Sequence, residues 1–329
     1  MAMSTTLESL LDAQRVLGNF PDVVRTPVVE LEMPHLSPSP QKIALKLESL
    51  QTTGSFKIRG MRHKIAKSSA ETLAAKGIVT MSAGNAGKAV SYLASKIGCS
   101  AHIYMPDTAP EERKRVMEDL GATVVPTPGP QLLAKVEEHV NSTGAIFVHP
   151  FDDVDIIRGH ASCGLEILED VPDVDVVVVC CGGGGLLAGV ASAIKLKAGP
   201  STRVIGVEPE GANSMWLSVK AGEAQWCKDG GKTSTIAHGL APPFAGASCY
   251  DHVQRFVDEI VLVSDDEMRR ATAALFASGI VAEISGAAAL AAVMAGKCGD
   301  IAGKTVCCTV SGRNIGIEEL REELHEISL

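Results

Sequence analysis

The chain has 329 residues, of which 46% are hydrophobic and 21% are charged, enough for one large core or two domains. Its formal net charge is -9, and it has no long block of Lys and Arg. This argues against a nucleic-acid partner, which would need clustered cations, and makes a small molecule the expected ligand.

The N-terminal segment and the cysteines together predict a cellular location. Residues 1–20 contain Glu8 and Asp12 among their leucines and have no sustained apolar stretch, so we expect neither a signal peptide nor a membrane span. The nine cysteines form an odd set without C-x-x-C spacing, and the pairs Cys180-Cys181 and Cys307-Cys308 lie in apolar runs. We interpret them as buried free thiols, which predicts a reducing, cytoplasmic location.

Short apolar runs alternate with alanine-rich helical segments along the chain. Continuous apolar runs such as Val176–Val179 are typical of a parallel sheet that is buried on both faces. The pattern therefore predicts an α/β fold. Two sheets are expected, with a smaller one inserted between about Gly77 and Pro150. The expected strands are 42–47, 78–81, 102–105, 123–125, 145–149, 175–181, 204–208 and 305–311.

The first chemical motif is Ser55-Phe56-Lys57-Ile58-Arg59-Gly60, which follows Gly54. A lysine beside an aromatic ring in a turn of small residues can be desolvated, which lowers its pKa and favours the neutral amine. Such an amine can form a Schiff base with an aldehyde, and pyridoxal phosphate is the obvious candidate. The alternative is a helix start with a solvated basic face.

The second motif, Ser82-Ala83-Gly84-Asn85-Ala86-Gly87, follows the expected strand 78–81 directly. Backbone N–H groups, a hydroxyl and an amide meet there at a helix start, where they can hold a substrate α-carboxylate, and Asn85 could hydrogen-bond a cofactor ring oxygen. An ordinary helix cap by Ser82 or Asn85 is the alternative.

The third motif is the run Gly182-Gly183-Gly184-Gly185 between a buried strand and a helix that begins with Leu186. Glycines let the backbone close around an anion, and the helix start supplies free N–H groups and a positive dipole, so the motif predicts a phosphate site. Gly183, Gly185 and Ala188 also satisfy a dinucleotide fingerprint, and Glu208 follows at nearly the right distance. A dinucleotide-dependent oxidoreductase is therefore the alternative from another class.

Together the three motifs resemble the fold type II pyridoxal-phosphate enzymes, the tryptophan synthase β family, over nearly the whole chain. The chain is most similar to the serine/threonine dehydratase and serine racemase branch. Further segments fall in the order expected for that branch: Thr26-Pro27, Pro106, Gly121-Ala122, Val148-His149-Pro150, Gly159, Gly164, Glu208-Pro209 and 236–240. The resemblance implies a large cofactor domain, 1–73 with 153–329, a small substrate-loop domain, 74–152, and a homodimer. Each domain would be a largely parallel twisted sheet flanked by helices.

The resemblance also implies a role for each motif. Lys57 is the residue that binds the cofactor and the general base at Cα, and Phe56 packs near the ring. The phosphate is cradled by 182–185 with Leu186. The segment Ser82, Ala83, Gly84, Asn85 and Ala86 is the substrate loop, and Asn85 also serves the cofactor. Ser311 faces the pyridine nitrogen, and Glu283 occupies a cofactor position, although Ile284 follows it where the family usually has proline.

A hydroxyl at Ser311 need not keep the ring nitrogen protonated, which weakens the electron sink and suits β-elimination. We therefore expect an ammonia-lyase (dehydratase) that converts a β-hydroxy L-amino acid, such as L-serine or L-threonine, into a 2-oxo acid and ammonia. Serine racemase and cysteine-synthase-like β-replacement are the related alternatives. In racemases of this branch the motif is Ser-Ser-Gly-Asn, whose second serine returns the proton, whereas this chain has Ala83.

A cation site is a further expectation from the resemblance. Glu208, Ala212 and Ser214 match the family's cation site, with Ser214 where racemases that bind divalent cations have aspartate. Fewer charged oxygens favour potassium over magnesium or calcium. The alternative is a strand end and a loop without an ion.

Overall fold

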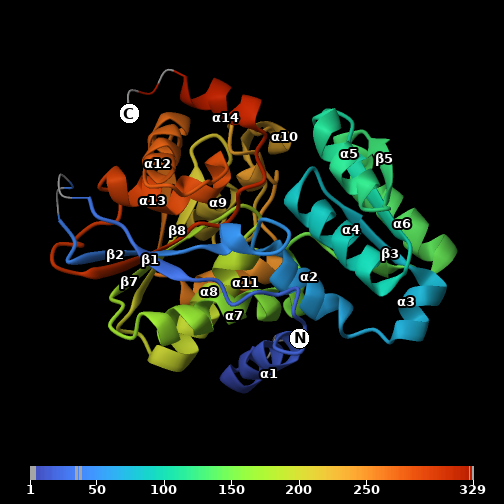
Figure 1. Cartoon of the computed structure of the whole chain (residues 1–329), viewed down its shortest axis with the longest axis horizontal. Coiled ribbons are helices and arrows are strands. Elements are labelled where there is room, and N and C mark those ends of the chain that lie inside the picture. The colour runs from blue at the N-terminus through green and yellow to red at the C-terminus, as the bar shows by residue number, and fades with distance from the viewer. Residues whose placement is uncertain (1–4, 34–35, 37–38, 326, 328–329) are drawn as a thin grey trace.

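The computed structural model describes residues 5–33, 36, 39–325 and 327, which fold around two sheets (Figure 1). The six-stranded sheet has the order β1-β2-β10-β7-β8-β9, and the four-stranded sheet has the order β5-β4-β3-β6. The strands of the larger sheet are β1 (Val28–Glu30), β2 (Lys42–Lys46), β7 (Val176–Cys180), β8 (Arg203–Pro209), β9 (Glu259–Val263) and β10 (Thr305–Thr309). Those of the smaller sheet are β3 (Ile78–Met81), β4 (Ala101–Pro106), β5 (Thr123–Thr127) and β6 (Ile146–Phe147).

Helices cover both faces of the larger sheet. Figure 1 shows α12 and α13 on one side of it and α7 and α8 on the other. The helices are α1 (Leu7–Leu17), α2 (Lys57–Ile65), α3 (Ala70–Lys76), α4 (Asn85–Ile97), α5 (Glu111–Asp119), α6 (Leu132–Thr143), α7 (Val154–Asp170), α8 (Gly185–Ala198), α9 (Ser214–Ala221), α10 (Lys228–Gly231), α11 (Ala247–Phe256), α12 (Asp265–Ala277), α13 (Ala288–Met294) and α14 (Ile317–Leu324).

The centre of the larger sheet explains the apolar runs in the sequence. Every residue of β7 is buried, and Val178 pairs with Cys308 of β10 and Ile205 of β8 in parallel register. A strand that is covered on both faces has no polar side, so its residues are apolar without alternation. The prediction of an α/β fold with largely parallel sheets is confirmed.

The smaller sheet is inserted in the larger one, because β3 to β6 all lie between Ile78 and Phe147 while β2 and β7 flank them in the chain. All its neighbouring strands are parallel. The domain limits 1–73 with 153–329 and 74–152 stay a prediction, and α3 (Ala70–Lys76) extends across the first of them.

Two strands were not predicted, and both lie at an edge of the larger sheet. β1 has only three residues and pairs antiparallel with β2, while β9 pairs only with β8. The three residues of β1 are too few to give a periodic signal, whereas β9 contains the continuous apolar run Ile260–Val263, a strand signal that the sequence prediction overlooked.

The cysteines match their interpretation as free thiols, although Cys99 is only partly buried. Across the described ranges, the structure contains no helix with both the length and the apolar character to span a bilayer.

Candidate active site

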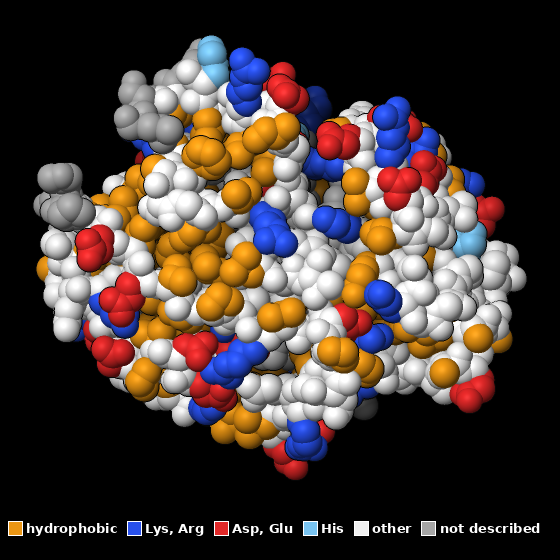
Figure 2. Space-filling view, in the orientation of Figure 1, with side chains coloured by type: hydrophobic (Ala, Val, Ile, Leu, Met, Phe, Trp, Pro, Cys, Tyr) orange, Lys and Arg blue, Asp and Glu red, His pale blue; other side chains and the backbone are white. Residues whose placement is uncertain are grey.

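A cavity of about 1060 Å³ lies between the larger lobe, built on the six-stranded sheet, and the smaller lobe, built on the four-stranded sheet. Figure 2 shows a hollow there with basic side chains at its edge. The loops that follow β3 and β10 both contribute to its wall. The cavity brings together most of the predicted site residues: Phe56, Lys57, Ser82, Ala83, Gly84, Asn85, Ala86, Glu283 and Ser311. Four separate sequence segments therefore converge on one space.

Lys57 is the first residue of α2 and lies in this cavity. Its Nζ donates a hydrogen bond to the carbonyl oxygen of Pro150 at 2.6 Å and lies 5.1 Å from the centre of the Phe56 ring. Burial lowers the pKa of Lys57 to about 8, because desolvation penalises the charged amine. The fraction of neutral, nucleophilic amine is thus larger than for an exposed lysine.

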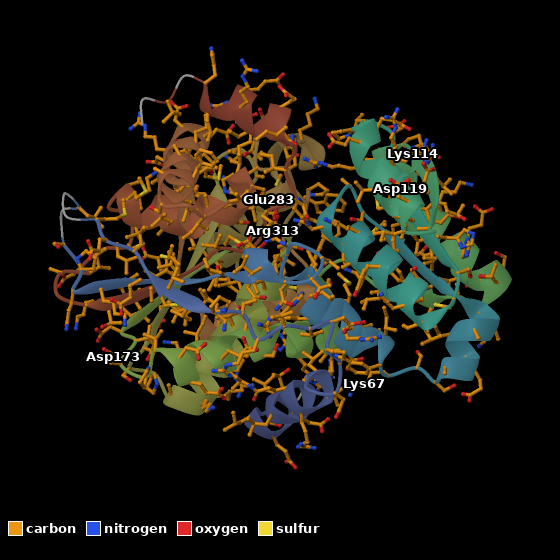
Figure 3. The ribbon with its side chains drawn as sticks, in the orientation of Figure 1. Lys67, Lys114, Asp119, Asp173, Glu283 and Arg313 are labelled. Atoms are coloured by element: carbon orange, nitrogen blue, oxygen red, sulfur yellow. The ribbon has the colours of Figure 1, made fainter. Side chains whose placement is uncertain are left out.

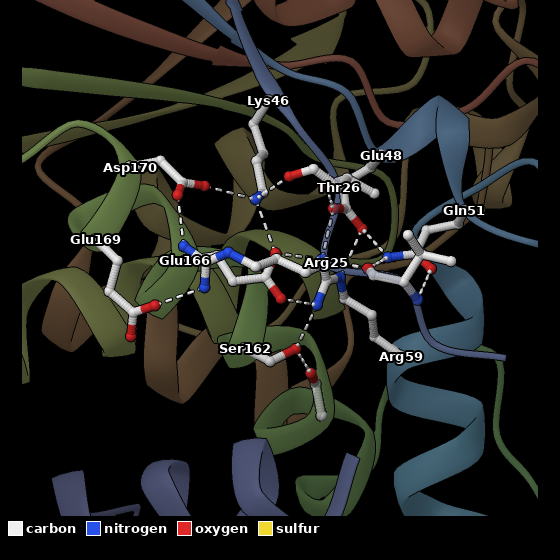
Figure 4. A network of polar contacts seen from close by, with 12 residues as sticks. Arg25, Thr26, Lys46, Glu48, Gln51, Arg59, Ser162, Glu166, Glu169 and Asp170 are labelled. Carbon is white, nitrogen blue, oxygen red and sulfur yellow. Dashed lines mark hydrogen bonds and ion pairs between the residues drawn. The ribbon is translucent and has the colours of Figure 1, made fainter. Parts of the chain in front are cut away.

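Contacts of residues before and after Lys57 in the sequence hold it in position. The backbone N–H of Phe56 donates to the carbonyl oxygen of Ser311 at 3.0 Å, which ties the start of α2 to the loop after β10. Two residues after Lys57, the guanidinium of Arg59 donates at 2.7 Å both to Glu48 and to Glu166 (Figure 4). Arg59 is only 1% exposed, so it is no part of a solvated basic face.

In the loop Ser82–Ala86 the structure shows the stabilising hydrogen bonds of Ser82 that the sequence offered as an alternative, while the binding of a substrate α-carboxylate stays a prediction. The hydroxyl of Ser82 accepts hydrogen bonds from the backbone N–H of Gly84 at 3.1 Å and of Gly87 at 2.8 Å, so it stabilises the turn. Asn85 begins α4, and its side chain donates to Glu283 at 2.6 Å and accepts from Asn314 at 2.6 Å. The amide has two donor hydrogens, so one remains for a ligand.

Glu283 is buried against this amide. Burial raises the pKa of its carboxyl to about 7, and the hydrogen bond from Asn85 opposes the rise. A carboxyl with this pKa is partly protonated at neutral pH and can then also donate a hydrogen bond.

The tetraglycine loop joins β7 to α8 but is not among the residues that line the cavity. It lies directly behind residues that do: a Cβ built on Gly183 would come 2.4 Å from the ring of Phe151, and one on Gly182 would come 3.2 Å from Leu240. Gly184 has a φ of 103°, which favours glycine. These glycines are therefore required by close packing and by backbone geometry. The first turn of α8 has no side-chain cap, which leaves its N–H groups suited to an anion.

Two thiols that the sequence did not assign to the site lie near Lys57, those of Cys249 and Cys180. Burial raises the pKa of Cys180 to about 11, although a hydrogen bond with Ser311 opposes this rise. Burial also raises the pKa of Cys249. Both therefore stay neutral beside the lysine amine. Pro150 and Asn314 are further site residues that sequence reasoning missed, because their roles depend on contacts between distant segments.

The structure shows Glu208 in a role other than cation binding, which was the role predicted for it. Its two carboxylate oxygens accept from the backbone N–H groups of Met215 at 2.9 Å and Trp216 at 2.7 Å, so it caps the start of α9 near Ser214 and Ala212. Burial raises its pKa to about 8. Within the described ranges, no three His, Cys, Asp or Glu residues are grouped to hold a metal ion. A cation at this site stays a prediction.

Known proteins resemble this chain over most of its length. A family model described as "Pyridoxal-phosphate dependent enzyme" matches residues 20–312. An L-threonine ammonia-lyase from Thermotoga maritima is 40% identical over 95% of this chain and 76% of its own length. The catabolic L-threonine dehydratase TdcB of Escherichia coli K12 is 40% identical over 85% of each chain.

Solved structures agree with these relatives. Maize serine racemase superposes with a TM-score of 0.87, at 29% identity and over 98% of both chains. Threonine deaminase isoform 2 from Solanum lycopersicum gives a TM-score of 0.88, at 29% identity, over 100% of this chain and 95% of its own. The resemblance inferred from the sequence is confirmed: a family model that spans most of the chain, together with relatives of this identity, places the protein in the family of pyridoxal-phosphate-dependent enzymes.

Proposed function

We propose that this protein eliminates water from a β-hydroxy L-amino acid, such as L-serine or L-threonine, and releases a 2-oxo acid and ammonia. The observation that carries the proposal is the half-buried Lys57, whose amine has a pKa lowered to about 8, in a cavity that also contains the loop Ser82–Ala86. The relatives named L-threonine ammonia-lyase and L-threonine dehydratase support the same reaction.

The residues present fit the cofactor that the family requires. Lys57 would bind its aldehyde, and the uncapped start of α8 with the loop 182–186 would hold its phosphate. The hydroxyl of Ser311 would face the ring nitrogen, and the remaining amide hydrogen of Asn85 would reach the ring oxygen. Phe56 would pack beside the ring, and Glu283 would hold Asn85 in place.

The cofactor, when bound, supplies an electron sink for the negative charge that develops at the substrate Cα. Lys57 takes the α-proton as general base, and its lowered pKa suits this task near neutral pH. The backbone N–H groups of the loop Ser82–Ala86 bind and orient the α-carboxylate. The β-hydroxyl leaves as water with a proton that balances the one Lys57 took from Cα, and addition of one water molecule then releases the 2-oxo acid and ammonia.

Racemisation and β-replacement are the related alternatives. A racemase needs a second acid that returns the proton to the opposite face of Cα, and the methyl group of Ala83 has no proton to transfer. The similarity to maize serine racemase keeps this alternative open to test. β-Replacement shares proton abstraction by Lys57, and product analysis separates it from elimination.

We propose further that the protein is a cytoplasmic homodimer and that a potassium ion binds near Glu208, Ala212 and Ser214. The resemblance to the dehydratase branch supports the dimer. The free, mostly buried thiols support a reducing compartment. The carboxylate of Glu208 already accepts two backbone hydrogen bonds, so a monovalent ion would share these oxygens.

The test is to purify the protein with pyridoxal phosphate, record its visible spectrum, and add L-threonine and L-serine separately. We expect a visible band that is lost in Lys57→Ala, together with release of a 2-oxo acid and ammonia. A band without 2-oxo acid from either substrate would reject the dehydratase proposal, and D-serine formation at the rate of deamination would favour racemisation.

A further inference from the structure

Two of the cations that line the active-site cavity, Lys88 and Arg313, have no part in the proposed reaction. Lys88 on α4 and Arg313 in the loop after β10 both line it, so they approach the space from the smaller and the larger lobe (Figure 3 labels Arg313 beside Glu283). Arg313 follows Ser311 by two residues, and Lys88 follows Asn85 by three, so both are next to predicted cofactor contacts.

Neither cation is neutralised. In the part of the chain that the structure describes, no carboxylate lies within 4.0 Å of the amine of Lys88 or the guanidinium of Arg313, whereas Arg113, a third cation of the cavity, pairs with Glu319 at 3.1 Å. The Nζ of Lys88 donates to the amide oxygen of Asn314 at 2.6 Å, which orients the amine without cancelling its charge.

The two cations also act on each other. The pKa of Lys88 is lowered by burial and further by the charge of Arg313, so the pair is close enough to repel. Glu283 acts on Lys88 in the opposite direction, but its carboxylate accepts a hydrogen bond from Asn85 instead. An arrangement of two like charges around a cavity is stabilised when an anion lies between them.

We propose that Lys88 and Arg313 form a second anion subsite, and that the preferred substrate is an acidic β-hydroxy amino acid with a carboxylate on its side chain. The inference rests on the proposed function, since the α-carboxylate is assigned there to the loop Ser82–Ala86. Arg313 offers a planar fork that suits a carboxylate, and Lys88 adds a point charge oriented by Asn314. Elimination of water followed by hydrolysis would give a dicarboxylic 2-oxo acid and ammonia.

The experiment compares two ligands that have nearly the same shape but differ in charge. L-Aspartate and L-asparagine both lack the β-hydroxyl leaving group, so their binding to the cofactor-loaded protein can be measured by calorimetry without elimination. We expect the wild type to bind L-aspartate at least about 10-fold more tightly than L-asparagine, the effect of one charge-assisted hydrogen bond. The variants Arg313→Gln and Lys88→Gln should each reduce this ratio towards one and leave the affinity for L-asparagine nearly unchanged.

Lys67→Gln is the matched control, because this substitution removes the same charge as the other two. Lys67 is exposed and lies away from the cavity (Figure 3). It should keep the wild-type ratio. Equal affinities for the two ligands in the wild type would overturn the proposal. An equal loss of affinity for both ligands in Arg313→Gln would also overturn it, since the pair would then bind the α-carboxylate.

A second measurement needs no variant. Raising NaCl from 50 to 500 mM should lower the affinity of the wild type for L-aspartate several-fold more than that for L-asparagine, because salt screens an open charged site. Identical salt dependence would contradict the subsite. Both measurements report binding, so they remain decisive even if L-threonine and L-serine are not deaminated and the proposed function itself fails.

Discussion

The amine of Lys57 donates a hydrogen bond of 2.6 Å to the carbonyl oxygen of Pro150, two residues that are 93 positions apart in the chain. A neutral carbonyl orients the amine but does not oppose its desolvation as a carboxylate would. The lowered pKa of about 8 therefore comes from burial, and it makes the first prediction possible.

The rate at which the cofactor-free protein binds pyridoxal phosphate should follow the neutral form of Lys57. The rate should rise about tenfold per pH unit below pH 8 and level off above it, because only the deprotonated amine attacks the aldehyde. Stopped-flow absorbance of the visible band measures it. A rate that keeps rising to pH 10 would show a lysine with an ordinary pKa, and Lys57→Ala should give no band.

Installing a proton donor in the substrate loop should produce racemase activity. Ala83→Ser places a hydroxyl beside the predicted position of the α-carboxylate, and we expect D-serine formation from L-serine to rise by at least about 10-fold, at the low end of acid–base effects. Chiral chromatography measures both enantiomers, and Ala83→Gly is the control without a hydroxyl. Wild-type racemisation as fast as deamination would contradict the role given to Ala83.

Glu283→Gln should change how stability depends on pH. Because burial raises the pKa of Glu283 to about 7, the folded state holds a proton between pH 4.5 and 7 that the unfolded state releases, so its contribution to stability falls as pH rises through this window. The glutamine side chain of the variant does not titrate, so the variant does not lose this stability as the pH rises. Between pH 5 and pH 8, the free energy of unfolding of the variant should improve relative to wild type by about 2 to 3 kcal/mol.

Urea denaturation of both proteins at the two pH values measures this difference. Glu208, whose pKa is raised to about 8, contributes a change of the same sign in both proteins and therefore cancels in the comparison. A constant difference between Glu283→Gln and wild type at pH 5 and pH 8 would show that Glu283 does not titrate in this window.

Gly183→Ala should weaken cofactor binding by displacing the loop that precedes α8. Its new methyl group would come 2.4 Å from the ring of Phe151, which must shift, so we expect the affinity for pyridoxal phosphate to fall by about 10-fold or more. Fluorescence titration measures the affinity. Gly18→Ala is the control, because its Cβ would have no atom closer than 3.4 Å and its φ is -59°. Unchanged affinity in Gly183→Ala would remove the loop from the cofactor site.

The local motifs were predictable because the residues that define each motif are consecutive in the sequence. Lys57 and the loop 82–86 line the cavity as expected, since both occur at strand-to-helix or turn positions that the sequence marks clearly. The neighbours of these motifs were not predictable. Cys249 lies beside the site because its thiol, on α11, contacts the carbonyl oxygen of Phe151, and Asn314 of the larger lobe donates a hydrogen bond to Asn85 of the smaller one. Such contacts depend on tertiary structure, for which a single sequence has no local signal.

The short edge strand β1 of the larger sheet shows the same limit for the fold. β7 was predicted because burial on both faces demands apolar residues throughout, while β1 owes its existence to pairing with β2 rather than to its own composition. The same holds for Glu208, whose capping of α9 depends on where the chain turns after β8.

Asn85 contacts Glu283 and Asn314, and its helix α4 belongs to the smaller lobe while both partners belong to the larger one. One side chain thus joins the two lobes at the place where we propose that the cofactor binds. If Asn85 also contacts the cofactor, binding of the cofactor and approach of the lobes are coupled, and the coupling is reciprocal: a ligand that draws the lobes together tightens cofactor binding, and loss of the cofactor loosens the lobes by the same free energy.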